Sequence, residues 1–296
     1  MMQDRSAFGA AMRRDTSGPS WRTRYRTVST SHGVIAVEGR GEHGLPVLFI
    51  HGNSSCSGVF DAQLNGPLPA AGVRLIAIDL PGHGQSADAL DPVRTYTRAG
   101  FAQVVCEVLE EIDVPEVVVV GWSLGGHIGM EMLATTPRVH GLMLIGAPPI
   151  GRDEGAQGFV RSAQSALAFQ QNWTLGEAHA FVSTIYGQMP GDRLRFAALR
   201  TDGRMRTRLF EAARTGLGVD QRRIVETSRV PLAIVNGAAD PLVNLDYFDS
   251  LAYANLWEGR CHRLSGLGHA PFWQAPDLFA PLLQRFVQEI SHNTRP

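Results

Sequence analysis

Three residues of this chain have the chemical types and the order that nucleophilic hydrolysis requires: Ser123, Asp240 and His269. A serine hydroxyl becomes an effective nucleophile when a histidine takes its proton, and a carboxylate holds that histidine in the correct tautomer. Asp240 lies in NGAADP and His269 in GLGHAP, each in a loop after a strand-like run. We therefore predict Ser123 as the nucleophile, Asp240 as the orienting acid and His269 as the general base.

The sequence around Ser123 supports this assignment. In EVVVVGWSLGGHIGMEML, the motif Gly-Trp-Ser-Leu-Gly stands directly after an apolar strand-like run and directly before a helix-like run. A serine on such a sharp turn presents its hydroxyl over the helix N-terminus, where developing negative charge is favoured. Residues packed against the turn must be small, and the glycines at 121, 125 and 126 meet that need.

The stretch FIHGNSSCSG is the other segment whose residue types could do chemistry. It follows an apolar run, and we expect it to face the serine turn, where the backbone N–H groups of Asn53 and Leu124 would form an oxyanion hole. We interpret His51 as a structural loop residue, and Cys56 has no visible charged partner that would activate it. The serines at 54, 55 and 57 are expected to cap the following segment and to line the pocket floor.

Two other acids are weaker candidates for the role given to Asp240. Asp79 precedes Ser123 in the chain, and its segment, AIDLPGHGQS, is typical of a structural loop. Asp246 falls inside the next helical pattern. The order serine, acid, histidine is therefore best satisfied by Asp240.

The composition is that of an ordinary globular protein: 296 residues, 44% hydrophobic, 19% charged, with a net charge of -1. This balance gives no electrostatic basis for binding nucleic acid or an anionic membrane, and no segment approaches the roughly 20 apolar residues that cross a bilayer. Three widely spaced cysteines argue against a disulfide framework, so we expect a cytoplasmic protein. Residues 1–27 are rich in arginine without the apolar core of a secretory signal, and we interpret them as a flexible arm.

Strand-like and helix-like runs alternate, which favours a mostly parallel α/β sheet. The expected strands are Gly33–Val37, Val47–Ile50, Val73–Ile78, Val117–Val120, Leu142–Ile145, Leu232–Val235 and Cys261–Leu264. The expected helices include Ala99–Ile112, His127–Ala134 and Asp277–Ile290. Residues 148–228 show helical patterns and no convincing strand, so we predict a helical cap there, inserted into a core of residues 28–147 and 229–296. The arginines at 200, 204, 206 and 208 are interpreted as solvated cap surface rather than an anion site.

Two classes of enzyme are disfavoured by missing motifs. The ten histidines include no H-x-H-x-D-H or H-E-x-x-H spacing, so we predict neither a metal nor any other cofactor. No G-x-G-x-x-G opens the first strand–helix turn, which argues against a dinucleotide-dependent dehydrogenase.

The motifs HGNSS, DLPGHGQS, GWSLGGH, NGAADP and GHAPF occur in the order found in the α/β-hydrolase superfamily, which the chain resembles over about residues 25–292. The resemblance implies a mostly parallel sheet flanked by helices with a helical cap. More narrowly, FIHGNSSCSGVFDAQL, GLMLIGAPPI, RTDGR and ANLWEG are similar to the metal-independent N-acyl-homoserine lactonases, which open the lactone ring of bacterial quorum-sensing signals. This implies a quorum-quenching enzyme whose partner is a small ester or lactone with an apolar acyl chain.

The resemblance also assigns the site, with two departures. Close relatives carry glutamate where this chain has Asp240, and either carboxylate can serve. A cap tyrosine that contacts substrate in the relatives aligns with Phe181, and Tyr186 lies near enough in sequence to replace it. We expect these two residues, together with Ser54 and Trp122, to contact the substrate.

Several other functions fit the same three residues. A carboxylesterase or a carbon–carbon bond hydrolase would use the same triad, and an acylase would release free homoserine lactone. Haloalkane dehalogenases and epoxide hydrolases use aspartate at the position of Ser123 and are disfavoured. A non-catalytic receptor on this fold is a further alternative. The sequence leaves the oligomeric state open, and a monomer is compatible with it.

Overall fold

The computed structural model describes residues 24–68, 72–152, 154–187 and 191–293. Most of the expected arm, residues 1–27, lies outside these ranges. Its last four residues correct the prediction, because they begin strand β1 (Arg24–Thr30), which pairs antiparallel with β2 (Gly33–Arg40). The strand was missed because its inward-facing positions include Arg26 and only one buried apolar residue, Val28.

The core of the fold is one eight-stranded sheet with the order β1-β2-β4-β3-β5-β6-β7-β8. Its remaining strands are β3 (Leu45–Ile50), β4 (Val73–Ile78), β5 (Val117–Trp122), β6 (Val139–Ile145), β7 (Leu232–Gly237) and β8 (His262–Leu264). The pairs from β4 to β8 are all parallel, while β2 pairs antiparallel with β4. The α/β class is confirmed, and β2 to β8 overlap the seven expected strands.

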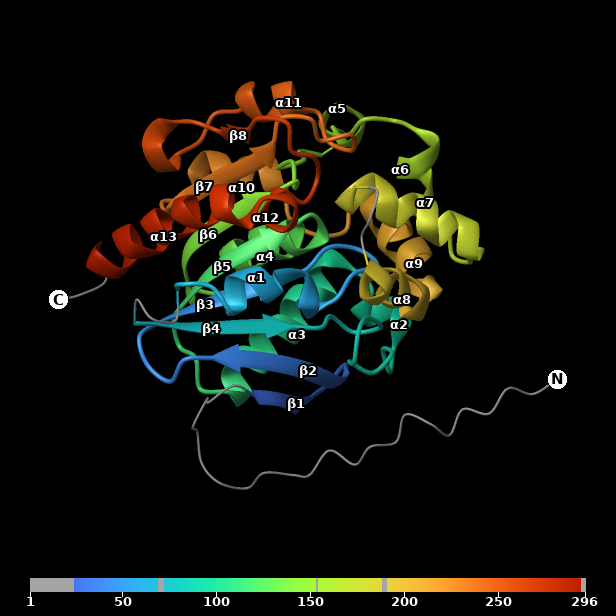
Figure 1. Ribbon diagram of the computed structural model, residues 1–296, viewed down its shortest axis with the longest axis horizontal. Helices are drawn as coiled ribbons and strands as arrows, with labels where there is room; N and C mark the ends of the chain where they lie inside the picture. Colours follow the sequence, from blue (N-terminus) through green and yellow to red (C-terminus); the bar gives the residue numbers. More distant parts are fainter. Residues whose placement is uncertain (1–23, 69–71, 153, 188–190, 294–296) are drawn as a thin grey trace.

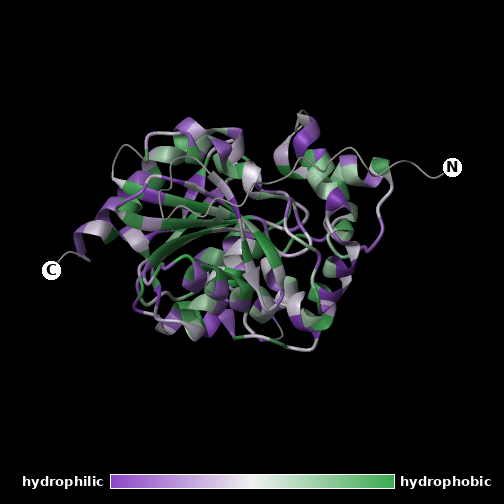
Figure 2. Ribbon diagram, turned by 90° about the horizontal axis from the view of Figure 1, so that it is seen from below, coloured by the Kyte–Doolittle hydropathy of each residue, from purple (hydrophilic) through white to green (hydrophobic). Residues whose placement is uncertain are grey.

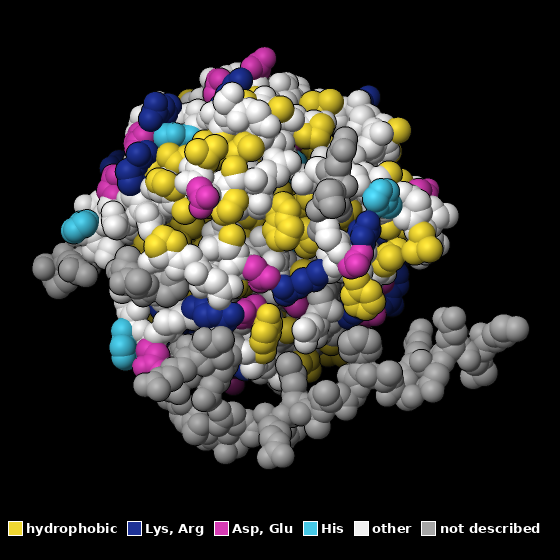
Figure 3. All heavy atoms as spheres, in the orientation of Figure 1, with side chains coloured by type: hydrophobic (Ala, Val, Ile, Leu, Met, Phe, Trp, Pro, Cys, Tyr) yellow, Lys and Arg dark blue, Asp and Glu magenta, His cyan; other side chains and the backbone are white. Residues whose placement is uncertain are grey.

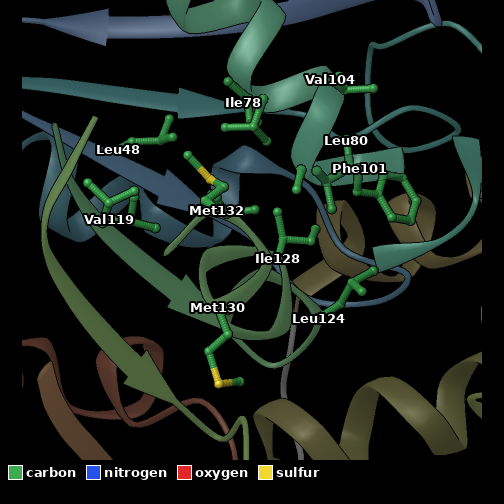
Figure 4. Packing of buried hydrophobic residues seen from close by; sticks show 14 of the residues in the cluster. Leu48, Ile78, Leu80, Phe101, Val104, Val119, Leu124, Ile128, Met130 and Met132 are labelled. Atoms are coloured by element: carbon green, nitrogen blue, oxygen red, sulfur yellow. The ribbon is translucent and has the colours of Figure 1, made fainter. Parts of the chain in front are cut away.

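The sheet is apolar on both faces because helices cover both (Figures 1 and 2). Along β5, Val117 and Val119 pack in one hydrophobic cluster, while Val118 and Val120 pack in the other, as the alternation of side chains along a strand requires. The first cluster includes side chains of α3 (Arg98–Glu111) and α4 (Leu124–Thr135), part of which Figure 4 shows. The second includes side chains of α12 (Pro271–Gln274) and α13 (Pro276–Asn293).

Parallel pairing brings the carboxyl ends of the central strands to one edge of the sheet. Ile50, the last residue of β3, pairs with Gly121 of β5, and Trp122 at the end of β5 pairs with Ile145 at the end of β6. Short segments complete the core: η2 (Ser57–Phe60), α1 (Asp61–Leu64), α2 (Pro92–Thr95), α11 (Leu245–Asp249) and η4 (Trp257–Gly259). Loops that follow these strand ends therefore converge on one region.

The described residues between β6 and β7 form α5 (Gly155–Gly158), α6 (Ala163–Leu167), α7 (Leu175–Tyr186), α8 (Gly191–Arg200), α9 (Gly203–Arg214) and α10 (Gln221–Thr227). Figure 1 shows α6 to α9 grouped beyond the arrowhead of β4. In the described part of this segment, the β pairing is an isolated bridge between Phe159 and Val243. We call the segment the cap, and its limits at 148 and 228 stay a prediction.

The surface carries hydrophobic side chains in small groups among charged ones on the face seen in Figure 3. Across the described ranges, none of the helices has the length and apolar character that crossing a membrane requires. The expected cytoplasmic location stays a prediction.

Candidate active site

The predicted nucleophile, Ser123, lies on the turn between β5 and α4. Its backbone has φ 53° and ψ −117°, a region that residues other than glycine rarely occupy. Three bonds hold this strained turn: the Ser123 N–H donates to the Ile145 carbonyl at 2.8 Å, and the Ser123 carbonyl accepts from the N–H groups of Gly126 and His127 at 2.9 and 3.2 Å. The turn is thus fixed to β6 on one side and to the first turn of α4 on the other.

The glycines around the turn are needed for space, as predicted. A Cβ atom on Gly125 would overlap the carbonyl oxygen of Ile50, and one on Gly121 would lie 2.5 Å from the carbonyl oxygen of Gly125. A Cβ on Gly52, in the loop after β3, would lie 3.1 Å from the Cβ of Ser123. The loop after β3 therefore faces the serine turn at close range.

Asp240 and His269 meet as predicted. The imidazole Nδ1 donates to Asp240 Oδ2 at 2.7 Å, and both side chains are almost fully buried. The other carboxylate oxygen accepts from the N–H groups of Leu242 and Val243 at 2.8 and 3.3 Å. Asp240 therefore stabilises its own turn and orients the imidazole at once. With the proton on Nδ1, the opposite nitrogen, Nε2, is left able to accept a proton, as the predicted role of His269 requires.

Two further contacts fix His269. Its carbonyl accepts a hydrogen bond of 2.9 Å from the indole Nε1 of Trp122, and the two rings lie 5.6 Å apart. Its ring also lies against Gly146, just after β6, where a Cβ would come within 2.6 Å of Cε1. Asn236 of β7 holds that glycine by accepting its N–H at 2.8 Å. The ends of β5, β6 and β7 thus share in placing the predicted base.

The two predicted oxyanion donors are free to bind a ligand. Within the described part of the chain, neither the Asn53 N–H nor the Leu124 N–H donates to another residue. The Asn53 side chain, in contrast, is fully engaged: Nδ2 donates to the Ala168 carbonyl at 2.9 Å, and Oδ1 accepts from the Ser54 hydroxyl at 2.8 Å. Such a pair of unused N–H groups beside a serine turn is what an oxyanion hole needs.

The expectation that the serines of FIHGNSSCSG cap the next segment is wrong. The N-cap residue of η2 is Cys56, and no side chain caps that helix. The N–H of Ser57 instead donates to the Asp79 carboxylate at 2.6 Å, so the role falls to a residue from the next strand end. Ser55 hydrogen-bonds the Tyr186 hydroxyl at 2.8 Å, and the Ser54 hydroxyl lies between Asn53 and the cap.

The remaining candidates near this loop are structural, in agreement with the sequence. The buried His51 ring accepts from the Leu80 N–H at 3.0 Å and donates to the Gly52 carbonyl at 2.7 Å, and burial lowers its pKa. Asp79 also accepts from the Gln85 N–H at 2.8 Å. Burial raises the pKa of the Cys56 thiol to about 11, so it stays protonated and unreactive at neutral pH.

Of the two cap residues expected to contact the substrate, Tyr186 lies next to Trp122, the neighbour of Ser123 in the chain. The ring of Tyr186 is 5.6 Å from that of Trp122, and burial raises the pKa of its phenol. Phe181 packs on Trp173 with their centroids 4.7 Å apart. Trp122 is fully buried and supports His269 in this conformation. The predicted substrate contacts of these residues stay predictions.

The interpretation of the cap arginines as solvated surface is correct for Arg204 and Arg208, whose side chains are about half exposed (50% and 48%). It is wrong for Arg206, which is only 3% exposed. Arg206 lies on one helical face with Met205 and Leu209, which pack in the core, and that pattern was the missed signal. Arg200 is also bound to the core, because its Nη2 donates to the Ser86 carbonyl at 2.7 Å.

The segment between these arginines joins the cap to the core loop that follows β4. The N–H of Asp202 donates to the Gly82 carbonyl at 2.8 Å, and the Asp202 carboxylate accepts from the Tyr96 hydroxyl at 2.6 Å.

Among the described residues, no group of three or more His, Cys, Asp or Glu side chains could hold a metal ion. The expected independence from metals stays a prediction.

The chain belongs to the α/β hydrolase family, whose family model matches residues 47–282. It is a hydrolase that acts on ester or lactone bonds. The structure of the N-acyl homoserine lactonase AidH complexed with N-butanoyl homoserine is 42% identical, with a TM-score of 0.88 over 90% of this chain and 97% of that one. The resemblance to these lactonases is thereby confirmed.

Esterases are also similar to this chain, at lower identity. The esterase RhEst1 from Rhodococcus sp. ECU1013 is 26% identical, with a TM-score of 0.75 over 90% of this chain and 99% of that one. The pimeloyl-(acyl-carrier protein) methyl ester esterase of Stenotrophomonas maltophilia (strain R551-3) is 32% identical over 269 residues, which cover 87% of this chain and 97% of the relative.

Proposed function

We propose that this protein opens the lactone ring of N-acyl-homoserine lactones by nucleophilic catalysis. The observation that carries the proposal is the 42% identity and TM-score of 0.88 with a lactonase whose structure holds N-butanoyl homoserine. The identity to the esterase relatives is lower, at 32% or less. The Asp240–His269 contact and the unused N–H groups of Asn53 and Leu124 support the proposal.

In this mechanism, the Ser123 hydroxyl attacks the lactone carbonyl carbon while Nε2 of His269 takes its proton. The carbonyl oxygen becomes an oxyanion, which the N–H groups of Asn53 and Leu124 bind. Each such donor is worth about 10²–10³ in rate. Collapse breaks the ring C–O bond, and His269 gives its proton to the departing homoserine oxygen. Water, deprotonated by His269, then attacks the acyl-serine. The bond between the Ser123 oxygen and the acyl carbon breaks, His269 returns the proton to that oxygen, and the ring-opened acyl-homoserine is released.

The cap supplies the apolar surroundings that an acyl chain requires. Phe181, Tyr186 and Trp122 belong to one hydrophobic cluster, against which Trp173 packs. Burial of each methylene of a chain against such side chains is worth roughly 0.8 kcal/mol. The Tyr186 hydroxyl, bound to Ser55, is the polar group of this wall and takes over the substrate contact for which Phe181 has no hydroxyl. Opening of signal lactones in this way would be quorum quenching.

The test is to incubate the protein with N-butanoyl- and N-octanoyl-homoserine lactone and to follow acid release and the ring-opened product, with and without a chelator. We expect opening that the chelator does not affect and that Ser123→Ala lowers by about 10⁶, as in the best-studied serine hydrolase. Failure to open either lactone, or loss of opening on chelation, would contradict the proposal. Release of free homoserine lactone would instead identify an acylase.

A carboxylesterase is the second candidate, favoured by the 28–32% identity to the pimeloyl-(acyl-carrier protein) methyl ester esterases. The two candidates differ in the ratio of kcat/KM for lactones to that for short p-nitrophenyl esters and methyl esters. A ratio well above one supports the lactonase, and a ratio well below one supports the esterase. Binding of either substrate without turnover would favour a receptor, and turnover of a carbon–carbon substrate alone would favour that class of hydrolase.

A further inference from the structure

A buried guanidinium stands behind the predicted oxyanion hole. Arg206 of α9 is 3% exposed, and its groups all have partners: Nε donates to the Gln170 carbonyl at 2.8 Å, Nη2 to the Gln171 carbonyl at 3.2 Å, and Nη1 to the Ser54 hydroxyl at 2.9 Å. Its Cζ lies 3.9 Å from the ring centroid of Trp173. Burial of a charge costs free energy, so this placement requires interactions that offset the cost.

The compensation is not an ion pair. Among the described residues, no carboxylate lies within 4 Å of the Arg206 guanidinium, and its partners are carbonyls, a hydroxyl and an aromatic ring. Burial lowers its pKa to about 10, which still leaves it charged at neutral pH. The Asp202 carboxylate attracts this charge from beyond contact distance. The charge polarises the hydrogen-bonding groups next to it.

The groups next to it lead to Asn53. Arg206 donates to the Ser54 hydroxyl, this hydroxyl donates to Oδ1 of Asn53 at 2.8 Å, and Nδ2 of Asn53 donates to the Ala168 carbonyl at 2.9 Å. All three bonds run in the same direction, which makes them cooperative. Ser54 itself has φ 57°, so the chain after Asn53 is held in a left-handed turn.

We propose that Arg206 is a positioning residue for the oxyanion hole: through Ser54 it fixes Asn53 so that the Asn53 N–H points at the oxyanion. The bond from Asn53 to Ala168 and the bonds from Arg206 to Gln170 and Gln171 make this geometry depend on the cap. Ser54 is then a relay rather than a substrate contact, since its proton is already donated to Asn53. This inference rests on the proposed site but not on the lactone as substrate.

The test therefore uses p-nitrophenyl butyrate, which either a lactonase or an esterase with this site would hydrolyse. For Arg206→Met we expect kcat to fall about 10- to 100-fold, less than on complete loss of an oxyanion donor, while KM changes less than three-fold. The affinity for butylboronic acid, which forms a tetrahedral adduct on the serine, falls by the same factor as kcat. The affinity for butyrate, the planar product, is unchanged.

Four variants separate positioning from mere stability. Arg206→Lys keeps the charge and a donor toward Ser54, so it restores part of kcat. Ser54→Ala breaks the relay without removing the arginine and gives the same defect, and the double variant is no worse than Arg206→Met alone because both act on one chain. Arg208→Met removes an exposed arginine on the same helix and leaves all constants unchanged.

A lower melting temperature with unchanged kcat and boronate affinity would overturn the proposal, as would additive effects in the double variant. If Arg206→Met does not fold, Ser54→Ala alone decides the question by the same two readouts. A protein that hydrolyses the ester but opens no lactone contradicts the lactonase function and leaves this test intact. A protein whose ester hydrolysis survives Ser123→Ala contradicts the site itself.

Discussion

The residue that precedes the predicted nucleophile holds the predicted base: the indole Nε1 of Trp122 donates a 2.9 Å hydrogen bond to the main-chain carbonyl of His269. The two residues are far apart in sequence and come from different strand ends. Because Trp122 ends β5 and its neighbour Ser123 begins the turn, one rigid strand sets the position of the serine and of the histidine backbone together. Trp122 is fully buried, so this bond is shielded from water.

Replacement of Trp122 by phenylalanine should therefore lower kcat while the protein still folds. The change keeps an aromatic ring but leaves the His269 carbonyl without its donor, and a misplacement of the base of about 1 Å costs up to about 100-fold. Steady-state kinetics on a p-nitrophenyl ester measure the effect. Trp257→Phe is the matched control. Trp257 lies in η4 and its indole donates to Glu289 at 2.8 Å, so we expect no change in kcat for this variant. Equal effects of both variants would contradict the prediction.

Asp240→Asn should reduce kcat by about 10⁴, the effect of the same change in a well-studied serine protease. The amide oxygen can still accept from Leu242 and Val243, so the turn is retained. Its NH₂ group, however, meets Nδ1 of His269 and favours the tautomer with the proton on Nε2. The pH-independent kcat reports the loss. The control is Asp246→Asn, whose side chain is 91% exposed and which we expect to be fully active.

Stability should fall as the pH drops below about 6.5, because buried neutral histidines support the loop after β3. Burial lowers the pKa of His83 well below its usual value, and it lowers that of His51 as well. In this window the unfolded chain binds more protons than the folded one, so stability is full above the unfolded pKa and is lost on acidification. Each such histidine contributes about 1.4 kcal/mol per pH unit.

Urea unfolding between pH 7.5 and 5.5 measures this slope. His83→Gln should lower the free energy of unfolding and make it vary less with pH, since one of the two buried rings, His51 and His83, is removed. His43, whose side chain is 94% exposed, provides the control, and His43→Gln should leave the slope unchanged. A free energy of unfolding that does not vary across this range would be inconsistent with neutral buried rings.

Gly125→Ala should destabilise the protein by about 3 kcal/mol or more, because its methyl group would overlap the Ile50 carbonyl, a backbone atom that cannot rotate away. Gly155→Ala is the matched control: no atom lies within 4 Å of its added methyl group, and its φ is not in the left-handed region. Thermal unfolding of the two variants compares them directly. Similar melting temperatures would contradict the prediction and show that the turn at Ser123 can relax.

The turn at Ser123 and the Asp240–His269 contact were predictable, because local motifs at strand ends mark both. Ser123 follows a run of valines, and Asp240 and His269 each follow a strand-like run in the order that the fold requires. The burial of Arg206 was not predicted, because arginines normally mark a solvated face and its partners, Ser54 and two carbonyls, lie far away in the chain. The Trp122–His269 bond has no sequence signal at all, since a backbone carbonyl carries no residue identity.

The sequence did not predict strand β1 or the contacts of the loop serines, and the two reasons are related. Alternation in β1 places Arg26 on the inner face beside Val28, so the strand lacks an apolar stripe. Their residue type predicts that the serines cap a helix, whereas it is Asp79, in the loop after β4, that accepts the N–H of Ser57. Local patterns predict elements well, but they do not show which distant side chain satisfies an unpaired donor.

The bonds of Asp202 to Gly82 and Tyr96 have a practical consequence for redesign. Replacing the cap helices with those of another family member, in order to change substrate preference, would remove these hydrogen bonds. It would also remove the hydrogen bond from Arg206 to Ser54. In a chimera that carries only the foreign cap, the loop after β3 would lack this support, and we expect a lower turnover. The unit to exchange is the cap together with the loops after β3 and β4.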